Sequence, residues 1–205
     1  MIDLYTANTS NGNRAAIILE ECGLPYRVHK YDLMKGEHRT PEFLSVAPAG
    51  SIPVIVDPAG PGGKRITLAQ SCAILLYVAE KAGKFIPQDA ADRATAMQWL
   101  MQAGTDVSAA SAAVFFNLAL LPDKSEANGK FNQERVLRYF RDCERQLTGR
   151  DYLAGEISIA DFALYPVYAT RKPLIEAADS LPNVSAWGAR IAARPGVQKG
   201  MQAAA

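Results

Sequence analysis

Residues 51–71 read SIPVIVDPAGPGGKRITLAQS, and this stretch decides the fold of the first third of the chain. The segments SIPVIVD and KRITL each have the length and β-branched content of a short strand. Between them lies PAGPGG, which consists of turn-forming residues, so the two segments are predicted to pair as an antiparallel hairpin. The segment QSCAILLYVAEKAG then has the apolar spacing of an amphipathic helix that begins near Ser71 and ends before Gly83.

The residues before this hairpin predict a parallel pair of strands. IDLYT at positions 2–6 is typical of a short strand, and PYRVHKYDL is typical of a second. The segment between them has helical spacing, with Ser10 or Asn11 placed to cap its start and Gly23 placed to end it. A strand, a helix and a strand in this order imply parallel pairing with a crossover helix. The apolar residues that share one face of that helix are Ala15, Ile18, Leu19 and Cys22.

Beyond about residue 86 the pattern changes, and it predicts helices without any further strand. The chain is therefore expected to divide into an α/β domain at 1–82, with the order βαβββα, and an all-α domain at 89–205. The short Ala-rich end of the chain is expected to fray. The helices predicted in the second domain cover about 90–120, about 132–147, GEISIADFALYPVYA, and NVSAWGARIAAR between Pro182 and Pro195.

The composition is that of an ordinary globular protein, and it argues against several classes of function. The net charge of the 205 residues is +1, so neither nucleic acid nor an anionic membrane surface is an expected partner. The sequence contains no run of about 18 apolar residues, which predicts no membrane span, and Asp3 interrupts any signal peptide. The three cysteines, Cys22, Cys72 and Cys143, have no metal-binding spacing, which predicts no metal site and a cytoplasmic location.

The proline at the start of the hairpin and the serine at the start of the following helix suggest a ligand site. If the Ile52–Pro53 bond is cis, the backbone of Ile52 turns outward and can pair with a peptide ligand as a strand does. Ser71 adds a hydroxyl and free amides at a helix N-terminus, which suit a carboxylate. The plain alternatives are a trans proline on an edge strand and an ordinary helix cap. The joint spacing of the two features within the βαβββα pattern favours the ligand site.

Four segments resemble the glutathione S-transferases: NTSNG after the first strand, SVAPAGSIPVIVD, LAQSCAILLYVAEK and GEISIADFALYP. The resemblance extends over essentially the whole chain. It implies a thioredoxin-like first domain, a helical second domain and a homodimer. It also implies that Pro53 is the cis proline, that Ile52 pairs with the cysteinyl backbone of glutathione, and that Gln70 and Ser71 hold its γ-glutamyl end.

The same resemblance bears on two individual residues, one that differs from many relatives and one that is a further candidate to bind glutathione. Many relatives carry an acidic residue where this chain has Gln70, which can accept from and donate to the glutamyl group but lacks the charge. His38, next to Arg39 in KGEHRTPEFL, is a candidate for the glycyl carboxylate of glutathione. The alternative is that His38 is a solvated loop histidine.

The residue that activates the glutathione sulfur is expected in the first loop. A free thiol has a pKa near about 8.5, so donors near a helix N-terminus are needed to stabilise the thiolate. The sequence T-x-N-G is similar to the bacterial Nu-class members, which implies that Thr9 and Asn11 face the sulfur, with Ser10 as a further candidate. The alternative makes Asn11 a plain helix cap. The other hydroxyl side chains of this region are Tyr5, which ranks low because it lies inside the strand, and Thr6.

No cysteine occupies this loop, which argues against the classes that form a mixed disulfide through a loop cysteine. Cys72 follows Ser71 at a helix start, where a thiol can be acidified, but core packing is the favoured interpretation. Ser158 and Asp161 have the spacing of a capping box, so a substitution at Asp161 is expected to reduce stability by roughly 1 kcal/mol and to leave the chemistry alone.

The wall that contacts the second substrate is expected in the helical domain. Aromatic residues at helical spacing are more often core, but the candidates for this wall are Phe115, Phe116, Tyr168 and Arg171, together with Asn117 and Tyr165. The implied function is glutathione transfer to small electrophiles in detoxification, or reduction of disulfides or organic peroxides. The loop with Thr9 and Asn11 favours the reduction of disulfides or peroxides over transfer. The alternative is a non-catalytic binding or docking module on the same fold.

Overall fold

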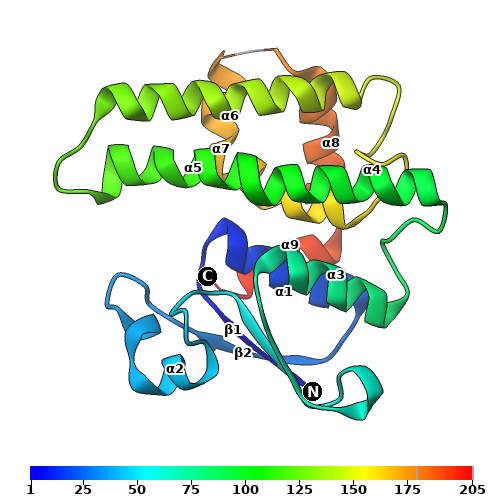
Figure 1. Cartoon of the computed structure of the whole chain (residues 1–205). Helices are drawn as coiled ribbons and strands as arrows, with labels where there is room; N and C mark the ends of the chain where they lie inside the picture. The colour runs from blue at the N-terminus through cyan, green and yellow to red at the C-terminus, as the bar shows by residue number, and fades with distance from the viewer. Residues whose placement is uncertain (179, 205) are drawn as a thin grey trace. The chain divides into compact units, whose positions relative to one another are not determined.

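The computed structural model describes residues 1–178 and 180–204. These residues form two compact units (Figure 1). The first unit comprises Met1–Ile86 together with Ala192–Ala205, and the second comprises Pro87–Ile191. The division differs from the domain limits expected from the sequence, 1–82 and 89–205, because the C-terminal segment packs with the first unit.

A four-stranded mixed sheet forms the centre of the first unit. Its strands are β1 (Ile2–Thr6), β2 (Tyr26–Lys30), β3 (Val54–Asp57) and β4 (Ile66–Ala69), in the spatial order β2-β1-β3-β4. β1 pairs with β2 in parallel, whereas β3 runs antiparallel to both β1 and β4. The predicted parallel pair and the predicted hairpin are both confirmed. All four residues of β3 are buried, as expected of an apolar strand inside a sheet.

Three helices gather on one face of this sheet: α1 (Ser10–Cys22), α3 (Ser71–Ala82) and α9 (Pro195–Gln202) (Figure 1). A short helix, α2 (Pro41–Val46), lies apart from them and is preceded by the 3-10 turn η1 (Glu37–Arg39). A second 3-10 turn, η2 (Pro61–Gly63), lies in the hairpin connection. The sequence pattern does not predict α2, because it is only six residues long, nor α9, which precedes the Ala-rich end of the chain.

The packing of α9 on α1 accounts for its place in the first unit. A Cβ atom at Gly200 would lie 2.5 Å from the Cα atom of Ile17, so the two helix backbones approach closely. The guanidinium of Arg194 also donates two hydrogen bonds to the carboxylate of Glu21, at 3.1 Å and 2.5 Å. Both contacts join residues far apart in the chain, and local sequence spacing therefore carries no sign of them.

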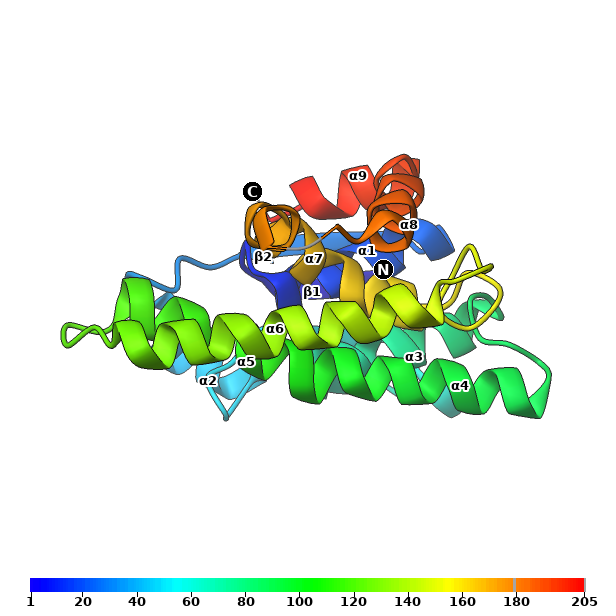
Figure 2. The same cartoon turned by 90° about the horizontal axis from the view of Figure 1, so that it is seen from above.

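The second unit is helical, as predicted. One long helix is made of α4 (Ala90–Met101), the π-helical turn η3 (Gln102–Val107), α5 (Ser108–Phe115) and the π-helical turn η4 (Phe116–Leu120). α6 (Glu126–Gln146) runs beside this long helix (Figure 2). The unit continues with α7 (Ile159–Ala178) and α8 (Pro182–Ala192).

The start of α6 lies six residues before the predicted position. Gly129 lies inside the helix, although glycine weakens a helix interior, and Ser125 caps the start by accepting a hydrogen bond from the amide of Asn128. A Cβ atom at position 129 would overlap the side chain of Leu118. The glycine therefore serves the close packing of α6 on η4 and does not end the helix.

The segment Ala90–Leu120 is long and apolar enough to cross a membrane by length and composition alone, in contrast to the expectation of no membrane span. One such helix is weak evidence, because the core helices of globular domains pass the same test. Within the second unit this segment packs against α6 and α7, which gives part of its apolar surface a protein partner.

Ser158 and Asp161 form the predicted structural element at the start of α7. The amide of Ser158 donates to Asp161 Oδ2 at 2.9 Å, and its hydroxyl donates to the same oxygen at 3.3 Å. The amide of Leu153 and the indole N–H of Trp187 donate to Oδ1 at 3.1 Å and 2.8 Å. Asp161 is fully buried, and this burial raises the pKa of its carboxyl against the opposing effect of these hydrogen bonds.

Candidate functional site

The loop between β1 and α1 ends in a threonine cap. The Thr9 hydroxyl oxygen accepts a hydrogen bond from the amide of Gly12 at 3.0 Å, and the backbone of Thr9 is extended. The cap is therefore Thr9, and not Ser10 or Asn11 as the spacing suggested. The next turn passes so close to the loop that a Cβ atom at Gly12 would overlap the carbonyl oxygen of Ala7.

Asn11 has a different partner, an arginine that the sequence analysis did not single out. Nη1 of Arg14 donates to Asn11 Oδ1 at 2.7 Å and to the Ser71 hydroxyl oxygen at 3.2 Å. The Arg14 side chain is almost completely buried, with 1% of its surface exposed. A signal for this residue exists in the sequence, because an arginine stands directly before the apolar run AAIIL. Its contact joins the two predicted parts of the glutathione site.

Gln70 and Ser71 occupy the junction between β4 and α3. Gln70 adopts φ 73° and ψ 112°, a backbone conformation that residues other than glycine rarely adopt, and its side chain is exposed. Such conformations are concentrated at functional sites, since the surrounding structure must hold them in place. Ser71 is the first residue of α3 and is 8% exposed, so its hydroxyl lies at the helix N-terminus as predicted.

The Ile52–Pro53 peptide bond is cis, as the family resemblance implies. Pro53 is buried and Ile52 is half-buried. Within residues 1–178 and 180–204, neither the N–H nor the C=O group of Ile52 forms a hydrogen bond. This backbone is therefore available to a peptide-like ligand, which is the arrangement expected for the cysteinyl part of glutathione.

His38 lies in η1 and is half-buried. Its Nδ1 atom is buried and has no hydrogen-bond partner among the residues that the structure describes. The neighbouring Arg39 is exposed, and its guanidinium approaches the backbone of Gly50, where a Cβ atom would lie 2.7 Å from Nη1. Arg39 therefore borders the loop of the cis proline from the same segment as His38.

The two remaining hydroxyl side chains of the first strand face other groups. The Tyr5 ring stacks on His29, with ring centroids 4.5 Å apart, and packs near Phe43 in a small aromatic cluster. Thr6 is fully buried. Thr9 and Asn11 are therefore better placed than either of them to reach a ligand at the surface.

Comparison with known proteins decides the family. Residues 10–81 match the model of the glutathione S-transferase N-terminal domain, and residues 106–202 match the model of the C-terminal domain. The chain belongs to the glutathione S-transferase family. The two matched regions lie on either side of the predicted domain boundary.

Two curated relatives from Escherichia coli K12 in this family are disulfide-bond oxidoreductases. The oxidoreductase YfcG is 40% identical over 95% of this chain and 92% of its own length. The oxidoreductase YghU is 31% identical over 97% of this chain and 73% of its own length. The chain is therefore an enzyme-family member related to the Nu-class proteins, as the T-x-N-G motif indicated.

Solved structures of the family share the same fold. A glutathione transferase from Pseudomonas putida, with one glutathione disulfide bound per subunit, is 34% identical and has a TM-score of 0.90, covering 98% of this chain and 90% of that one. A glutathione transferase from Burkholderia graminis, with two glutathione molecules per subunit, is 35% identical with a TM-score of 0.90, covering 98% and 87%.

The three cysteines of the chain are all free thiols. Cys22 is buried, as its helical spacing predicts, and Cys143 is buried as well. Burial raises the pKa of Cys22 to about 11 and also raises the pKa of Cys143. Cys72, for which core packing was favoured, is only partly buried. Among the described residues no three His, Cys, Asp or Glu side chains gather as a metal site would require.

The side chains predicted to contact a second substrate belong to the second unit of the chain and differ in exposure. Phe115 and Phe116 are each 45% exposed, with ring centroids 6.0 Å apart. Tyr168 lies in the core, where its ring meets Trp187 edge-on and a Cβ atom at Gly188 would overlap it. Arg171 is half-buried and donates to both the hydroxyl and the carbonyl oxygen of Ser111, at 2.9 Å and 2.6 Å. Only the two phenylalanines present open surface.

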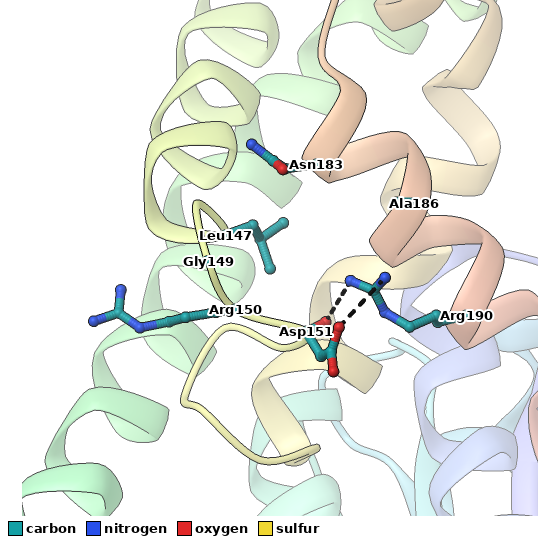
Figure 3. A pocket seen from close by; sticks show the side chains of 7 residues that line it. All are labelled: Leu147, Gly149, Arg150, Asp151, Asn183, Ala186 and Arg190. Carbon is teal, nitrogen blue, oxygen red and sulfur yellow. Dashed lines mark hydrogen bonds and ion pairs between the residues drawn. The ribbon is translucent and has the colours of Figure 1, made fainter.

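A shallow pocket of about 270 Å³ also lies in the second unit, between the end of α6 and α8 (Figure 3). The guanidinium of Arg190 in this pocket donates a hydrogen bond to the backbone carbonyl oxygen of Asp151 at 3.0 Å and forms an ion pair with the Asp151 carboxylate at 3.5 Å. The pocket contains none of the predicted site residues. The residues that line it are Leu147, Gly149, Arg150, Asp151, Asn183, Ala186 and Arg190.

Proposed function

We propose that this chain is a glutathione-dependent disulfide reductase that uses the neutral donors Thr9 and Asn11 to stabilise the glutathione thiolate. The observation that carries the proposal is the hydrogen bonding of these two side chains. The Thr9 oxygen accepts from Gly12 and the Asn11 oxygen accepts from Arg14, so each residue keeps protons to donate. Both stand at the N-terminus of α1, where the helix dipole favours an anion. The enzyme would act where glutathione is kept reduced, as in the cytoplasm.

The binding of glutathione follows from the groups around this pair. The free N–H and C=O of Ile52 pair with the cysteinyl part of the ligand. Gln70 and Ser71 hold the γ-glutamyl end, and His38 contacts the glycyl carboxylate. The crystal structures of the relatives from Pseudomonas putida and Burkholderia graminis, which contain glutathione disulfide and glutathione respectively, support this choice of ligand.

The reaction is a pair of thiol–disulfide exchanges. The glutathione thiolate attacks one sulfur of a substrate disulfide, a mixed disulfide forms, and the other substrate sulfur leaves as a thiolate that takes up a proton. A second glutathione thiolate attacks the glutathione sulfur of the mixed disulfide and releases the second substrate thiol. Two glutathione molecules are oxidised to one glutathione disulfide, and one substrate disulfide is reduced to two thiols. No protein cysteine takes part.

Turnover of a small disulfide with glutathione tests the proposal. We expect Thr9→Ala and Asn11→Ala each to lower kcat/KM at neutral pH by about tenfold or more, because losing one unit of thiol pKa depression leaves about a tenth of the thiolate. Thr9→Ser keeps the hydroxyl and is expected to retain most of the rate. Cys72→Ser is expected to match the wild type. A Cys72→Ser variant without activity would contradict the proposal, because it would place the reactive thiol on the protein.

The related activities are outcomes of the same assay. Cumene hydroperoxide and a chlorinated aromatic, each tested with glutathione, report peroxidase and transferase activity. A protein that turns over none of the three substrates, and whose melting temperature does not rise in millimolar glutathione, would be a docking module and would contradict the proposal.

The second unit also supports the homodimer that the family resemblance implies. Large apolar side chains are exposed along the long helix, and a contiguous group of such side chains often marks a protein–protein contact. Sedimentation equilibrium at micromolar concentration measures the oligomeric state, and a monomer there would contradict this part of the proposal. The large apolar side chains of this helix that are exposed are Met101, Phe115, Phe116 and Leu120.

A further inference from the structure

We propose that Arg14 is a positioning residue that sets the direction of the hydrogen-bond donors at both ends of the glutathione site. The proposal rests on the proposed function, since it concerns how the same site holds its ligand. Arg14 lies in the second turn of α1, three residues after Asn11 in the first turn and five after the cap residue Thr9. Arg14 acts on the ligand through Asn11 and Ser71, which it orients.

One nitrogen of Arg14 joins two parts of the site that lie 57 residues apart in the chain. Nη1 donates to Asn11 Oδ1 at 2.7 Å and to the hydroxyl oxygen of Ser71 at 3.2 Å. The first distance is that of a strong hydrogen bond from a charged donor. The guanidinium thus ties the N-terminal turn of α1, on the sulfur side, to the N-terminal turn of α3, on the glutamyl side.

The contact determines which way the Asn11 amide points. A guanidinium carries only donors, so the atom that faces Arg14 must be the amide oxygen, and the NH₂ group must point away. Asn11 is exposed, and in the part of the chain that the structure describes its NH₂ group has no hydrogen-bond partner. A thiolate is a pure acceptor. Arg14 therefore presents to the sulfur the one end of Asn11 that stabilises it.

The same reasoning applies to the Ser71 hydroxyl. Its oxygen accepts from Arg14, so its proton is directed elsewhere, and no acceptor for that proton occurs in residues 1–178 or 180–204. The γ-glutamyl carboxylate of glutathione is an acceptor without donors when ionised. A single buried cation thus orients a donor for the thiolate and a donor for the carboxylate.

The positive charge of Arg14 favours an anionic ligand, as does the orientation of the donors that it sets. Asn11, Ser71 and Gln70 are all neutral, so the guanidinium meets no negative charge from these three side chains. Burial lowers the pKa of Arg14, while the nearby Cys72 thiol acts in the opposite direction, and an arginine remains protonated throughout the working range of pH. A bound anion at either end of the ligand is stabilised by this buried cation.

The Asn11→Asp variant tests the proposal without removing Arg14. An aspartate keeps an oxygen towards the guanidinium, gains an ion pair and folds, but it presents a second oxygen in place of the NH₂ group. We expect the thiol of bound glutathione, titrated by the ultraviolet absorbance of its thiolate, to ionise about one pH unit higher or more, with about a tenfold loss of kcat/KM at neutral pH. The affinity for S-methylglutathione, which has no thiol, is expected to stay within about twofold.

The Arg14→Met variant removes both ends of the connection. It is expected to shift the thiol titration as Asn11→Asp does and, unlike that variant, to weaken S-methylglutathione about tenfold, because the Ser71 hydroxyl loses its orientation. Arg14→Lys keeps the charge but not the planar fork, and is expected to restore part of the affinity. The control is Arg194→Met, which removes another arginine packed on α1 but is expected to leave both ligand measurements unchanged.

The results separate the possible failures. An Asn11→Asp variant with the thiol titration of the wild type overturns the positioning role, as does a folded Arg14→Met variant with wild-type titration and affinity. In either case a wild type that binds glutathione and reduces disulfides leaves the proposed function intact. A wild type that binds no glutathione overturns both.

Discussion

Two buried charges, Arg14 in the first unit and Asp161 in the second, are equally shielded from water but differ in what surrounds them. Asp161 accepts hydrogen bonds from two backbone amides, a serine hydroxyl and the Trp187 indole, and all of these donors come from its own unit. Arg14 donates to Asn11 and Ser71, whose own protons then have no acceptor among the described residues.

This contrast distinguishes a buried charge that serves the scaffold from one that serves a binding site. A network in which every donor and acceptor is matched has nothing left for a ligand, so its loss is expected to cost stability alone. A network that ends in outward-pointing donors is complete only when an acceptor binds. Substitutions at matched networks in either unit should therefore change unfolding free energies, and substitutions around Arg14 should change ligand binding.

The largest effect is expected at Asp161. Asp161→Ala leaves the amides of Leu153 and Ser158 and the indole of Trp187 without an acceptor, at about 1–3 kcal/mol each. We expect the free energy of unfolding, measured by urea denaturation, to fall by about 3–5 kcal/mol. This exceeds the roughly 1 kcal/mol that the capping motif alone suggested. The folded fraction should bind glutathione as the wild type does, and a raised KM for glutathione would break the comparison.

The next effect concerns the turn that positions Thr9. Gly12→Ala places a Cβ atom against the Ala7 carbonyl oxygen and near the Thr9 hydroxyl, so we expect a loss of about 2–3 kcal/mol in unfolding free energy. Because the Thr9 hydroxyl must move, the rate with glutathione should also fall.

The matched control for Gly12→Ala is Gly23→Ala at the other end of α1. Gly23 has φ 72° and no atom within 4 Å of an added Cβ, so only backbone strain opposes the substitution. We expect a loss of about 1 kcal/mol with an unchanged kcat/KM. Equal kinetic losses in the two variants would show that stability, and not the position of Thr9, sets the rate.

A smaller effect is expected from the ion pair that fastens α9 to α1. The Glu21 side chain is 5% exposed, and Arg194→Met leaves it without its bidentate partner. We expect about 2 kcal/mol of lost stability, less than for a fully buried pair because Arg194 is 31% exposed. Thermal or urea denaturation measures it, and a stability unchanged from the wild type would show that α9 contributes little to the first unit.

The smallest effect is expected at Asp57, a buried carboxylate of the first unit whose hydrogen-bond donors also belong to that unit. Burial alone would raise the pKa of Asp57, but hydrogen bonds from Lys81, Tyr77 and the Ala59 amide together lower it. Because the pKa of Asp57 is lower in the folded than in the unfolded state, its ionisation stabilises the protein at pH values above the unfolded-state pKa of about 4. This stabilisation is lost as the pH falls through the folded-state pKa.

We therefore expect Lys81→Met to cost about 1 kcal/mol at pH 7, with the difference from the wild type vanishing in acid. Asp161, whose pKa is raised by burial, has the opposite sign, because its contribution to stability falls as pH rises above about 4. Urea denaturation of Lys81→Met and the wild type across this range of pH checks the first expectation. A difference that persists below the folded pKa would show that Lys81 acts through packing.

Much of the candidate site follows from local sequence. Pro53 before an apolar strand and Ser71 at a helix start are visible in residues 51–71, because turn residues, strand composition and helix starts are local properties. The cap at Thr9 was misassigned to its neighbours by one or two positions. Ser10, Asn11 and Thr9 all suit a cap, and only the extended backbone at residue 9 distinguishes them.

Local sequence was enough to predict the order of the four strands, the helical second unit, and Ser71 at the start of a helix. It also supplied the hypothesis that Ile52, Pro53, Gln70 and Ser71 form the glutathione site. Three contacts became visible in the folded chain alone: Arg14 donates to Ser71, α9 packs on α1, and the Trp187 indole donates to Asp161. The reason is physical. Periodicity and turn chemistry act over a few residues, whereas these contacts join segments brought together by packing, and the partner of a buried charge is set by which segments meet.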